Sequence, residues 1–250
     1  MAATTHLQDD WDRHWSDFGE AGEAGPSPKY RKRLILDLLA ETGCSRASTV
    51  LDIGSGRGEL TAAILAAFPG ARAIGLELSA TGVAVASRRV PEARFHQRDL
   101  LRGVDEADLP PERATYAVCT EVLEHIEDPA VLLRNAARYM APGCRLVVTV
   151  PGGPMCEFYR HIGHRRHYDT QSLRAVLEQA GFAVDRTYGA GFPFFNLFRI
   201  AITLRGNRLV ADATGTPSLP MRAAMGLFDL LFRLNLRRWG WQILAVARKA

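Results

Sequence analysis

From Ser48 onward, short runs of apolar and β-branched residues alternate with longer segments in which apolar residues recur every three or four positions. This alternation is typical of strands joined by helices, and it predicts a doubly wound α/β fold with a parallel sheet. The predicted strands cover residues 48–53, 71–77, 93–99, 115–120, 144–151, 182–189 and 241–248. The predicted helices lie near 58–67, 80–88, 129–140 and 170–180, and the last has Thr170 as its N-cap and Gly181 at its end.

Two segments depart from this alternation. Residues 1–27 are polar and end in GEAGEAGPSP, which predicts an N-terminal helix on a linker. A helix with Pro28 at its start follows, and the domain is expected to extend over 28–250. Residues 192–238 are too many for an ordinary loop and are rich in Phe, Leu and Arg, so we expect an irregular insertion that covers part of the domain.

The composition mainly argues against several classes of protein and site. The chain has 250 residues, of which 47% are hydrophobic and 23% charged, and no apolar run reaches the roughly 18 residues of a membrane helix. The first residues, MAATTHLQDDWDRHW, lack the basic and apolar parts of a signal peptide, which predicts a cytoplasmic location. The four cysteines form no C-x-x-C pair, and the net charge of +4 is spread over several segments. Neither a zinc site nor nucleic-acid binding is therefore indicated.

The stretch VLDIGSGRGEL places a glycine-rich turn between the first predicted strand and its helix. Such a turn brings backbone N–H groups to the carboxyl edge of the sheet, where open α/β folds bind ligands. The third glycine of a dinucleotide loop would fall at Glu59, and Asp52 and Glu59 would repel a pyrophosphate. No Gly-Lys-Ser/Thr follows, which excludes a P-loop. The turn therefore either binds a cofactor without phosphates or is a tight turn with no ligand.

The same stretch resembles motif I of the class I S-adenosylmethionine-dependent methyltransferases. AIGLELS, FHQRDLL and the block from YAVCTEVLEHIED to LVVTVP are similar to the next motifs of the small-molecule branch, which includes ubiquinone-biosynthesis methyltransferases. The resemblance implies a Rossmann-like sheet of seven strands with the last strand antiparallel, helices on both faces, and S-adenosyl-L-methionine as cofactor. Its sulfonium cation suits a loop flanked by acids, whereas the negative charge of a pyrophosphate does not.

The resemblance also implies a set of cofactor-binding residues. In the family, the acid that corresponds to Glu77 accepts hydrogen bonds from the ribose, the one at Asp99 lies near the adenine amino group, and Leu100 lies against the ring. An acid about 20 residues after the loop is the spacing that ribose recognition needs, although either acid alone reads equally well as a solvated carboxylate. The expected set is Asp52, Gly54, Ser55, Gly56, Gly58, Glu77, Leu78, Asp99, Leu100 and Thr120.

Methyl transfer requires an aligned acceptor and, for a hydroxyl or ammonium, removal of a proton. The candidates are His164, which we expect above the carboxyl edge of the sheet, and Glu121 and His125 beyond the fourth strand. His125 either catalyses or only packs and caps a helix. Arg165 is expected either to bind an anionic group of the acceptor or to form salt bridges. His161 and Tyr168 are the remaining candidate substrate residues.

The acceptor class follows from what the sequence lacks. The Asn/Asp-Pro-Pro-Tyr/Phe motif of base-modifying methyltransferases and the Pro-Cys of the C5-cytosine type do not occur. We therefore expect O- or N-methylation of a small molecule, with an RNA methyltransferase or a non-catalytic cofactor-binding protein as alternatives. The run HIGHRRH invites a metal, but its arginines oppose a cation, so no metal is expected. The insertion either walls a pocket for a hydrophobic acceptor or forms a homodimer interface.

Overall fold

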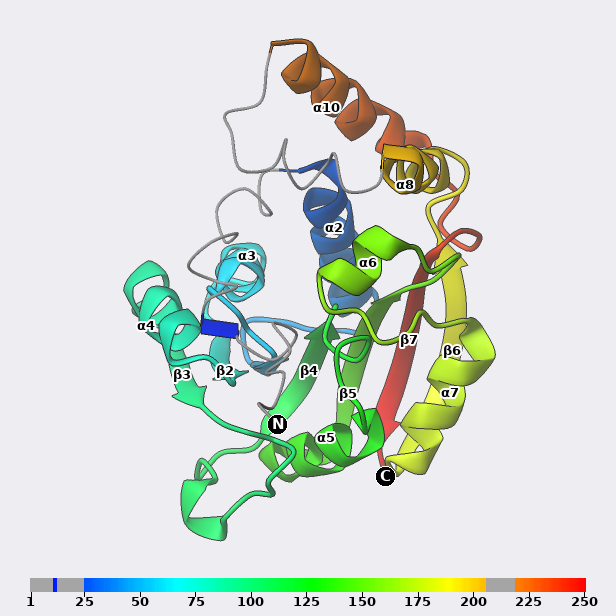
Figure 1. The fold of residues 1–250 in the computed structure, drawn as a ribbon. Helices are drawn as coiled ribbons and strands as arrows, with labels where there is room; N and C mark the ends of the chain where they lie inside the picture. The colour runs from blue at the N-terminus through cyan, green and yellow to red at the C-terminus, as the bar shows by residue number, and fades with distance from the viewer. Residues whose placement is uncertain (1–10, 13–24, 206–218) are drawn as a thin grey trace, which may run out of the picture.

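The computed structural model describes residues 11–12, 25–205 and 219–250 of the chain. Within these residues one sheet contains seven strands in the order β3-β2-β1-β4-β5-β7-β6 (Figure 1). The strands are Thr49–Ile53 (β1), Arg72–Glu77 (β2), Arg94–Gln97 (β3), Ala114–Thr120 (β4), Met140–Pro151 (β5), Phe182–Ala190 (β6) and Gln242–Lys249 (β7). The first five pair in parallel, and β7 runs antiparallel to both β5 and β6. The predicted sheet, with its last strand antiparallel, is confirmed.

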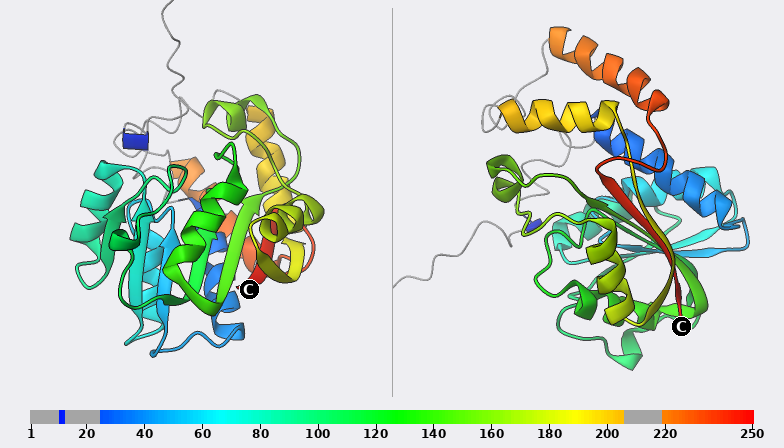
Figure 2. Two further views of the ribbon diagram at one scale, coloured as in Figure 1. Left: turned by 90° about the horizontal axis from the view of Figure 1, so that it is seen from below. Right: turned by 90° about the vertical axis from the view of Figure 1, so that its right-hand side faces the viewer.

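Helices cover both faces of this sheet (Figure 2). They are Pro26–Glu41 (α2), Glu59–Ala67 (α3), Ala80–Arg89 (α4), Pro129–Ala136 (α5), Glu157–His161 (α6), Thr170–Gln179 (α7), Phe194–Arg205 (α8) and Leu219–Leu231 (α10). Neighbouring strand residues such as Val147 and Val148 belong to separate core clusters, one packed under α2 and the other under α5 and α7. Burial on both faces explains the continuous apolar runs of the central strands. No described helix is long and apolar enough to cross a membrane.

Two helices begin at residues other than those expected. The helix that was predicted to start at Pro28 is α2, and it starts at Pro26. Pro28 also lies in its first turn, where a missing N–H costs no hydrogen bond. The N-cap of α7 is Asp169 and not Thr170, because the Asp169 carboxylate accepts a hydrogen bond of 2.7 Å from the N–H of Ser172. The Ser172 hydroxyl accepts one from the N–H of Asp169, which completes a capping box.

The expectation of an irregular insertion over 192–238 is wrong for its described part, which contains α8 and α10. Both helices pack beside α2 at the carboxyl end of the sheet (Figure 1). The Tyr30 ring on α2 lies 5.3 Å from that of Phe195 and 5.4 Å from that of Phe232, between ring centroids. Burial of these aromatic residues against α2 favours helix over loop. Residues 206–218 and most of the predicted N-terminal helix and linker lie outside the described residues, so the division of the chain stays a prediction.

Candidate active site

The loop between β1 and α3 presents its backbone at the carboxyl edge of the sheet. The φ angles of Gly54, Gly56 and Gly58 are 69°, 52° and 81°, in the left-handed region that favours glycine. The N–H of Gly54 donates to the carbonyl of Leu76 at 2.8 Å, and a side chain at position 54 would collide with Val122. The loop therefore requires glycine for its own geometry.

Glu77, the last residue of β2, joins this loop through its side chain. One carboxylate oxygen accepts a hydrogen bond of 2.8 Å from the N–H of Gly56, and the other accepts one of 2.9 Å from the N–H of Ser79. The side chain is buried, and each carboxylate oxygen has two lone pairs. The geometry thus places the acid of the second-strand motif against the glycine loop, with acceptor capacity for further hydroxyl donors.

Asp52 lies beneath the loop in a nearly dry environment. The Thr61 hydroxyl donates to its carboxylate at 2.6 Å, and the residue is 2% exposed. Burial, with a smaller contribution from the Glu77 charge, raises the pKa of Asp52 from 3.8 to about 6. A cation bound beside the loop would favour the ionised form of this carboxyl group.

The remaining predicted cofactor residues meet at the same edge. The hydroxyl oxygens of Ser55 and Thr120 are buried and have no hydrogen-bond partner among the described residues, so a ligand would satisfy them. Asp99 follows β3 and accepts a hydrogen bond of 3.0 Å from the N–H of Leu101. Leu78 is 44% exposed, whereas Leu100 is buried in the core cluster on the α5 side. Buried hydroxyls beside a glycine loop and an acid fit an adenosyl cofactor.

Glu121 follows β4 and connects several elements by its side chain. One oxygen accepts hydrogen bonds from Gln242 of β7 at 2.9 Å and from the Thr149 hydroxyl of β5 at 3.3 Å. The other lies 3.6 Å from the guanidinium of Arg31 on α2. The φ angle of Glu121 is 53°, a left-handed conformation that non-glycine residues seldom adopt. The carboxylate is therefore held at the carboxyl edge by partners from three elements.

Glu124 is a site residue that the sequence analysis missed. Its side chain is fully buried, and neither carboxylate oxygen accepts a hydrogen bond from any described residue. Burial, together with the charge of Glu121, raises the pKa of Glu124 well above 4.5. The available signal was its position in EVLEH, an acid within an otherwise apolar turn next to the predicted catalytic residues.

The buried side chain of His164 lies between the half-buried rings of His125 and His167. The ring of His164 lies 4.8 Å from that of His125, and its Nδ1 lies 3.1 Å from Nε2 of His167. Because Nδ1 of His167 faces the carbonyl of Gly153 at 3.0 Å, it carries the proton, and Nε2 of His167 then accepts from His164. This assignment leaves the lone pair on Nε2 of His164. Burial, reinforced by His125 and His167, lowers the pKa of His164 from 6.5 to about 2.

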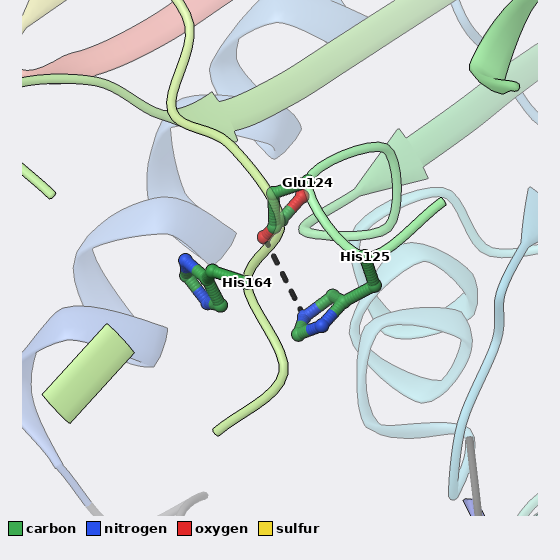
Figure 3. A group of neighbouring side chains, drawn as sticks. All are labelled: Glu124, His125 and His164. Carbon is green, nitrogen blue, oxygen red and sulfur yellow. Dashed lines mark ion pairs between the residues drawn. The ribbon is translucent and has the colours of Figure 1, made fainter. Parts of the chain in front are cut away.

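The same cluster includes the one group of three in the described chain that could hold a metal ion. The ligand atoms of Glu124, His125 and His164 lie within 4.8 Å of one another, and Figure 3 marks the pair formed by the Glu124 carboxylate and the His125 ring. The charges of Arg199 and Arg31 act on His164 and would oppose a bound cation. The sequence expectation of no metal stays untested.

The three residues that were expected to bind the acceptor differ in their contacts and in their exposure. The Nε of the Arg165 side chain donates to the carbonyl of His125 at 2.9 Å, and the backbone N–H of Arg165 donates to the carbonyl of Glu124 at 2.8 Å. Tyr168 is buried in the core, and its hydroxyl donates to the carbonyl of Leu123 at 3.0 Å. His161 lies exposed at the end of α6. Arg165 and Tyr168 thus hold the segment after β4, and their contact with an acceptor stays a prediction.

Arg199 on α8 is a second residue that the sequence analysis missed. It is 6% exposed, and its Nε donates to the hydroxyl of Tyr159 at 2.8 Å. The guanidinium carbon lies 4.6 Å from the centre of the Tyr159 ring, and no described acid pairs with it within 4 Å. A charged residue inside the apolar sequence FNLFRIAITL was the available signal. Arg199 is therefore a buried cation with no carboxylate partner among the described residues.

The fold thus brings the glycine loop, the carboxylate of Glu77 and the buried hydroxyls of Ser55 and Thr120 together at the carboxyl edge of an α/β sheet. The model of the methyltransferase domain family matches residues 28–187, so the chain belongs to this family. The trans-aconitate 2-methyltransferase of Azoarcus sp. (strain BH72) is 30% identical over 160 residues, which are 64% of this chain and 56% of that protein. The ubiquinone biosynthesis O-methyltransferase of Sodalis glossinidius is 34% identical over 115 residues, 44% of each. The family resemblance inferred from the motifs is confirmed.

Solved structures support the fold but differ in activity. The Haemonchus contortus phosphoethanolamine N-methyltransferase 2 in complex with S-adenosyl-L-methionine has a TM-score of 0.58 and 17% identity, with 87% of this chain and 52% of that chain covered. The [4+2]-cyclase SpnF has a TM-score of 0.59 and 18% identity, with 87% of this chain and 81% of that chain covered. The fold alone therefore does not decide the reaction. The chain spans about half the length of the curated relatives it matches.

Proposed function

We propose that this chain transfers a methyl group from S-adenosyl-L-methionine to a small-molecule acceptor. The observation that carries the proposal is the contact between Glu77 and Gly56, which joins the second-strand acid to the glycine loop. When bound, S-adenosylmethionine supplies the electrophilic methyl group. Glu77 would hold the ribose. The buried hydroxyls of Ser55 and Thr120 would form hydrogen bonds with the cofactor. Asp52 would favour a cationic cofactor over a pyrophosphate.

The acceptor side supports an anionic acceptor. Arg199 is buried without an acid partner, and a buried unpaired cation is costly unless a ligand supplies the opposite charge. Arg31 is already paired with Glu121, which leaves Arg199 as the cation available to a carboxylate or phenolate group. This assigns to Arg199 the orienting role that the sequence analysis gave to Arg165. The similarity to trans-aconitate 2-methyltransferases agrees with a carboxylate-bearing acceptor.

Two residues would act on the acceptor's proton and position. The lone pair on Nε2 of His164 accepts a hydrogen bond from the acceptor, and the neutral ring serves for orientation because its lowered pKa makes it a weak base. The Glu121 carboxylate, held by Gln242, Thr149 and Arg31, is the group that takes a proton from a hydroxyl or ammonium acceptor. His125, packed against His164 and Trp11, maintains the cluster.

An assay with methyl-labelled S-adenosylmethionine tests this function. The chain is incubated with separate panels of di- and tricarboxylates, phenols and amines, and product formation is followed by mass spectrometry. We expect label transfer to an acidic small molecule with equimolar formation of S-adenosylhomocysteine. Label found only in RNA would support the RNA methyltransferase alternative, and cofactor binding without transfer to any panel would support the non-catalytic one.

A further inference from the structure

Most of the large hydrophobic residues that are exposed in the described chain lie on α8, on α10 or in the segments next to these helices. Of the eleven large hydrophobic residues that are exposed in the described chain, nine lie between residues 192 and 239. Leu227 and Leu230 on α10 are 55% and 59% exposed, and Leu234 in the following turn is 67% exposed. Single exposed apolar residues are ordinary, but a concentration of them on one part of a surface indicates an interaction site.

A basic depression adjoins these leucines. It has a volume of about 360 Å³, lies between α2 and α10, and is lined by Lys29, Arg33, Gly226, Asp229, Leu230 and Arg233. Asp229, the one acid in the lining, already pairs with Lys29 at 2.8 Å. No acid of the described chain pairs with Arg33 or Arg233. The depression therefore carries a net positive charge directly beside an exposed leucine.

We propose that this face, formed by α10, the turn after it and the start of α2, binds an anionic phospholipid surface. Arg33 and Arg233 would contact a headgroup phosphate, while Leu227, Leu230 and Leu234 enter the boundary between headgroups and acyl chains. An apolar helix face flanked by cations is the pattern of helices that lie in a membrane interface. A second copy of the chain fits less well, because a two-fold contact here would bring together two depressions that each carry a net positive charge.

The face is connected to the acceptor side of the site through α8. The ring of Phe198 on α8 lies 4.9 Å from that of Phe228 on α10, between centroids. Arg199, the next residue of α8, contacts Tyr159 in the candidate site. In Figure 1, α10 lies beyond α2 and α8 at the carboxyl end of the sheet. Docking through α10 would therefore bring the acceptor side of the molecule close to the lipid surface.

Vesicle co-sedimentation of the full chain tests the proposal. Vesicles of phosphatidylcholine alone are compared with vesicles that contain about 30% phosphatidylglycerol, at about 0.1 M salt where surface charges still interact. We expect binding to the anionic vesicles only. Arg33→Gln/Arg233→Gln should weaken it on the order of tenfold or more. Leu227→Asn/Leu230→Asn/Leu234→Asn should weaken it to a similar extent, because it removes the apolar contact.

Matched variants separate this face from net charge and general hydrophobicity. Arg46→Gln/Arg88→Gln has the same net charge as the arginine pair above, and Leu101→Asn changes an exposed leucine after β3, at the other edge of the sheet. Both controls should bind anionic vesicles as the unmodified chain does. Equal losses in the two arginine pairs, full binding by the triple leucine variant, or no vesicle binding at all would overturn the proposal. So would a dimer, seen by sedimentation velocity, that the triple variant dissociates.

Discussion

The carboxylate of Glu77 accepts a hydrogen bond of 2.8 Å from the backbone N–H of Gly56, which lies 21 residues earlier in the chain. Its second oxygen accepts one from the N–H of Ser79, at the turn into α4. One side chain thus fixes the end of β2, the loop after β1 and the start of the next helix. The residue that is proposed to hold the ribose therefore also organises the glycine loop.

Replacement of Glu77 should affect binding and stability together. Hydrogen bonds to a charged group are each worth about 1.5–3 kcal/mol, so Glu77→Ala should weaken S-adenosylhomocysteine binding at least tenfold. It should also lower the free energy of unfolding by about 1–3 kcal/mol, because two buried N–H groups lose their acceptor. Calorimetric titration and urea denaturation measure the two effects. Unchanged affinity in a folded Glu77→Ala protein would show that the second-strand acid does not contact the cofactor.

Asp52 should make stability depend on pH. Its folded-state pKa of about 6 exceeds the usual 3.8, so its stabilising contribution is complete below pH 3.8 and is lost as the pH rises through 6. Asp52→Asn keeps an acceptor for the Thr61 hydroxyl without the buried charge. We expect the variant to be more stable than the parent by about 1–3 kcal/mol at pH 8 and by about half as much at pH 5. Urea denaturation at both values checks this, and a pH-independent difference would contradict it.

Arg199 should matter for the acceptor and not for the cofactor. Arg199→Met removes a buried charge that has no acid partner, so the free energy of unfolding should stay constant or rise. KM for an anionic acceptor should increase on the order of 10- to 100-fold, because a charge-assisted contact is lost. Arg199→Lys, which retains the charge but not the planar geometry, should lie in between. If Arg199→Met left KM unchanged and only destabilised the fold, Arg199 would be a structural residue.

His164 and Glu121 should differ in the size of their effects. Loss of one orienting hydrogen bond in His164→Ala should reduce kcat/KM about tenfold. Removal of the proton acceptor in Glu121→Gln should reduce it on the order of 10²-fold or more, while S-adenosylhomocysteine affinity stays the same in both. Arg165→Ala, whose guanidinium binds a backbone carbonyl, should be nearly silent in kcat/KM. A larger loss in His164→Ala than in Glu121→Gln would identify His164, and not Glu121, as the base among the candidates.

Local patterns were sufficient for the sheet and for the position of Glu77 beside the glycine loop. Each predicted strand overlaps its observed counterpart, since residues buried on both faces give continuous apolar runs that are hard to mistake. The glycine loop and Glu77 could be predicted because their spacing in the chain reflects one turn and two neighbouring strands. The Asp169 cap was missed because both Asp169 and Thr170 are good capping residues, and the choice between them depends on a contact with Ser172.

The acceptor side depends on contacts between distant segments, which no local pattern contains. Gln242 reaches Glu121 across 121 residues, and Arg199 reaches Tyr159 across 40. The helices α8 and α10 were expected to be irregular because their aromatic residues acquire a partner only when α2 packs beside them. The sequence therefore could not show that Gln242 contacts Glu121 or that Arg199 is buried against Tyr159.

The central claim is that the loop and Glu77 bind an adenosyl-sulfonium cofactor and not a dinucleotide. Calorimetric titration of the same preparation with S-adenosylmethionine, S-adenosylhomocysteine and NAD tests it most directly, with Gly56→Val as the variant whose side chain and strained φ close the loop. The account predicts one-to-one binding of the first two ligands, no binding of NAD, and loss of binding in a Gly56→Val protein that remains folded. Binding of NAD, or unaltered S-adenosylmethionine binding in Gly56→Val, would contradict it.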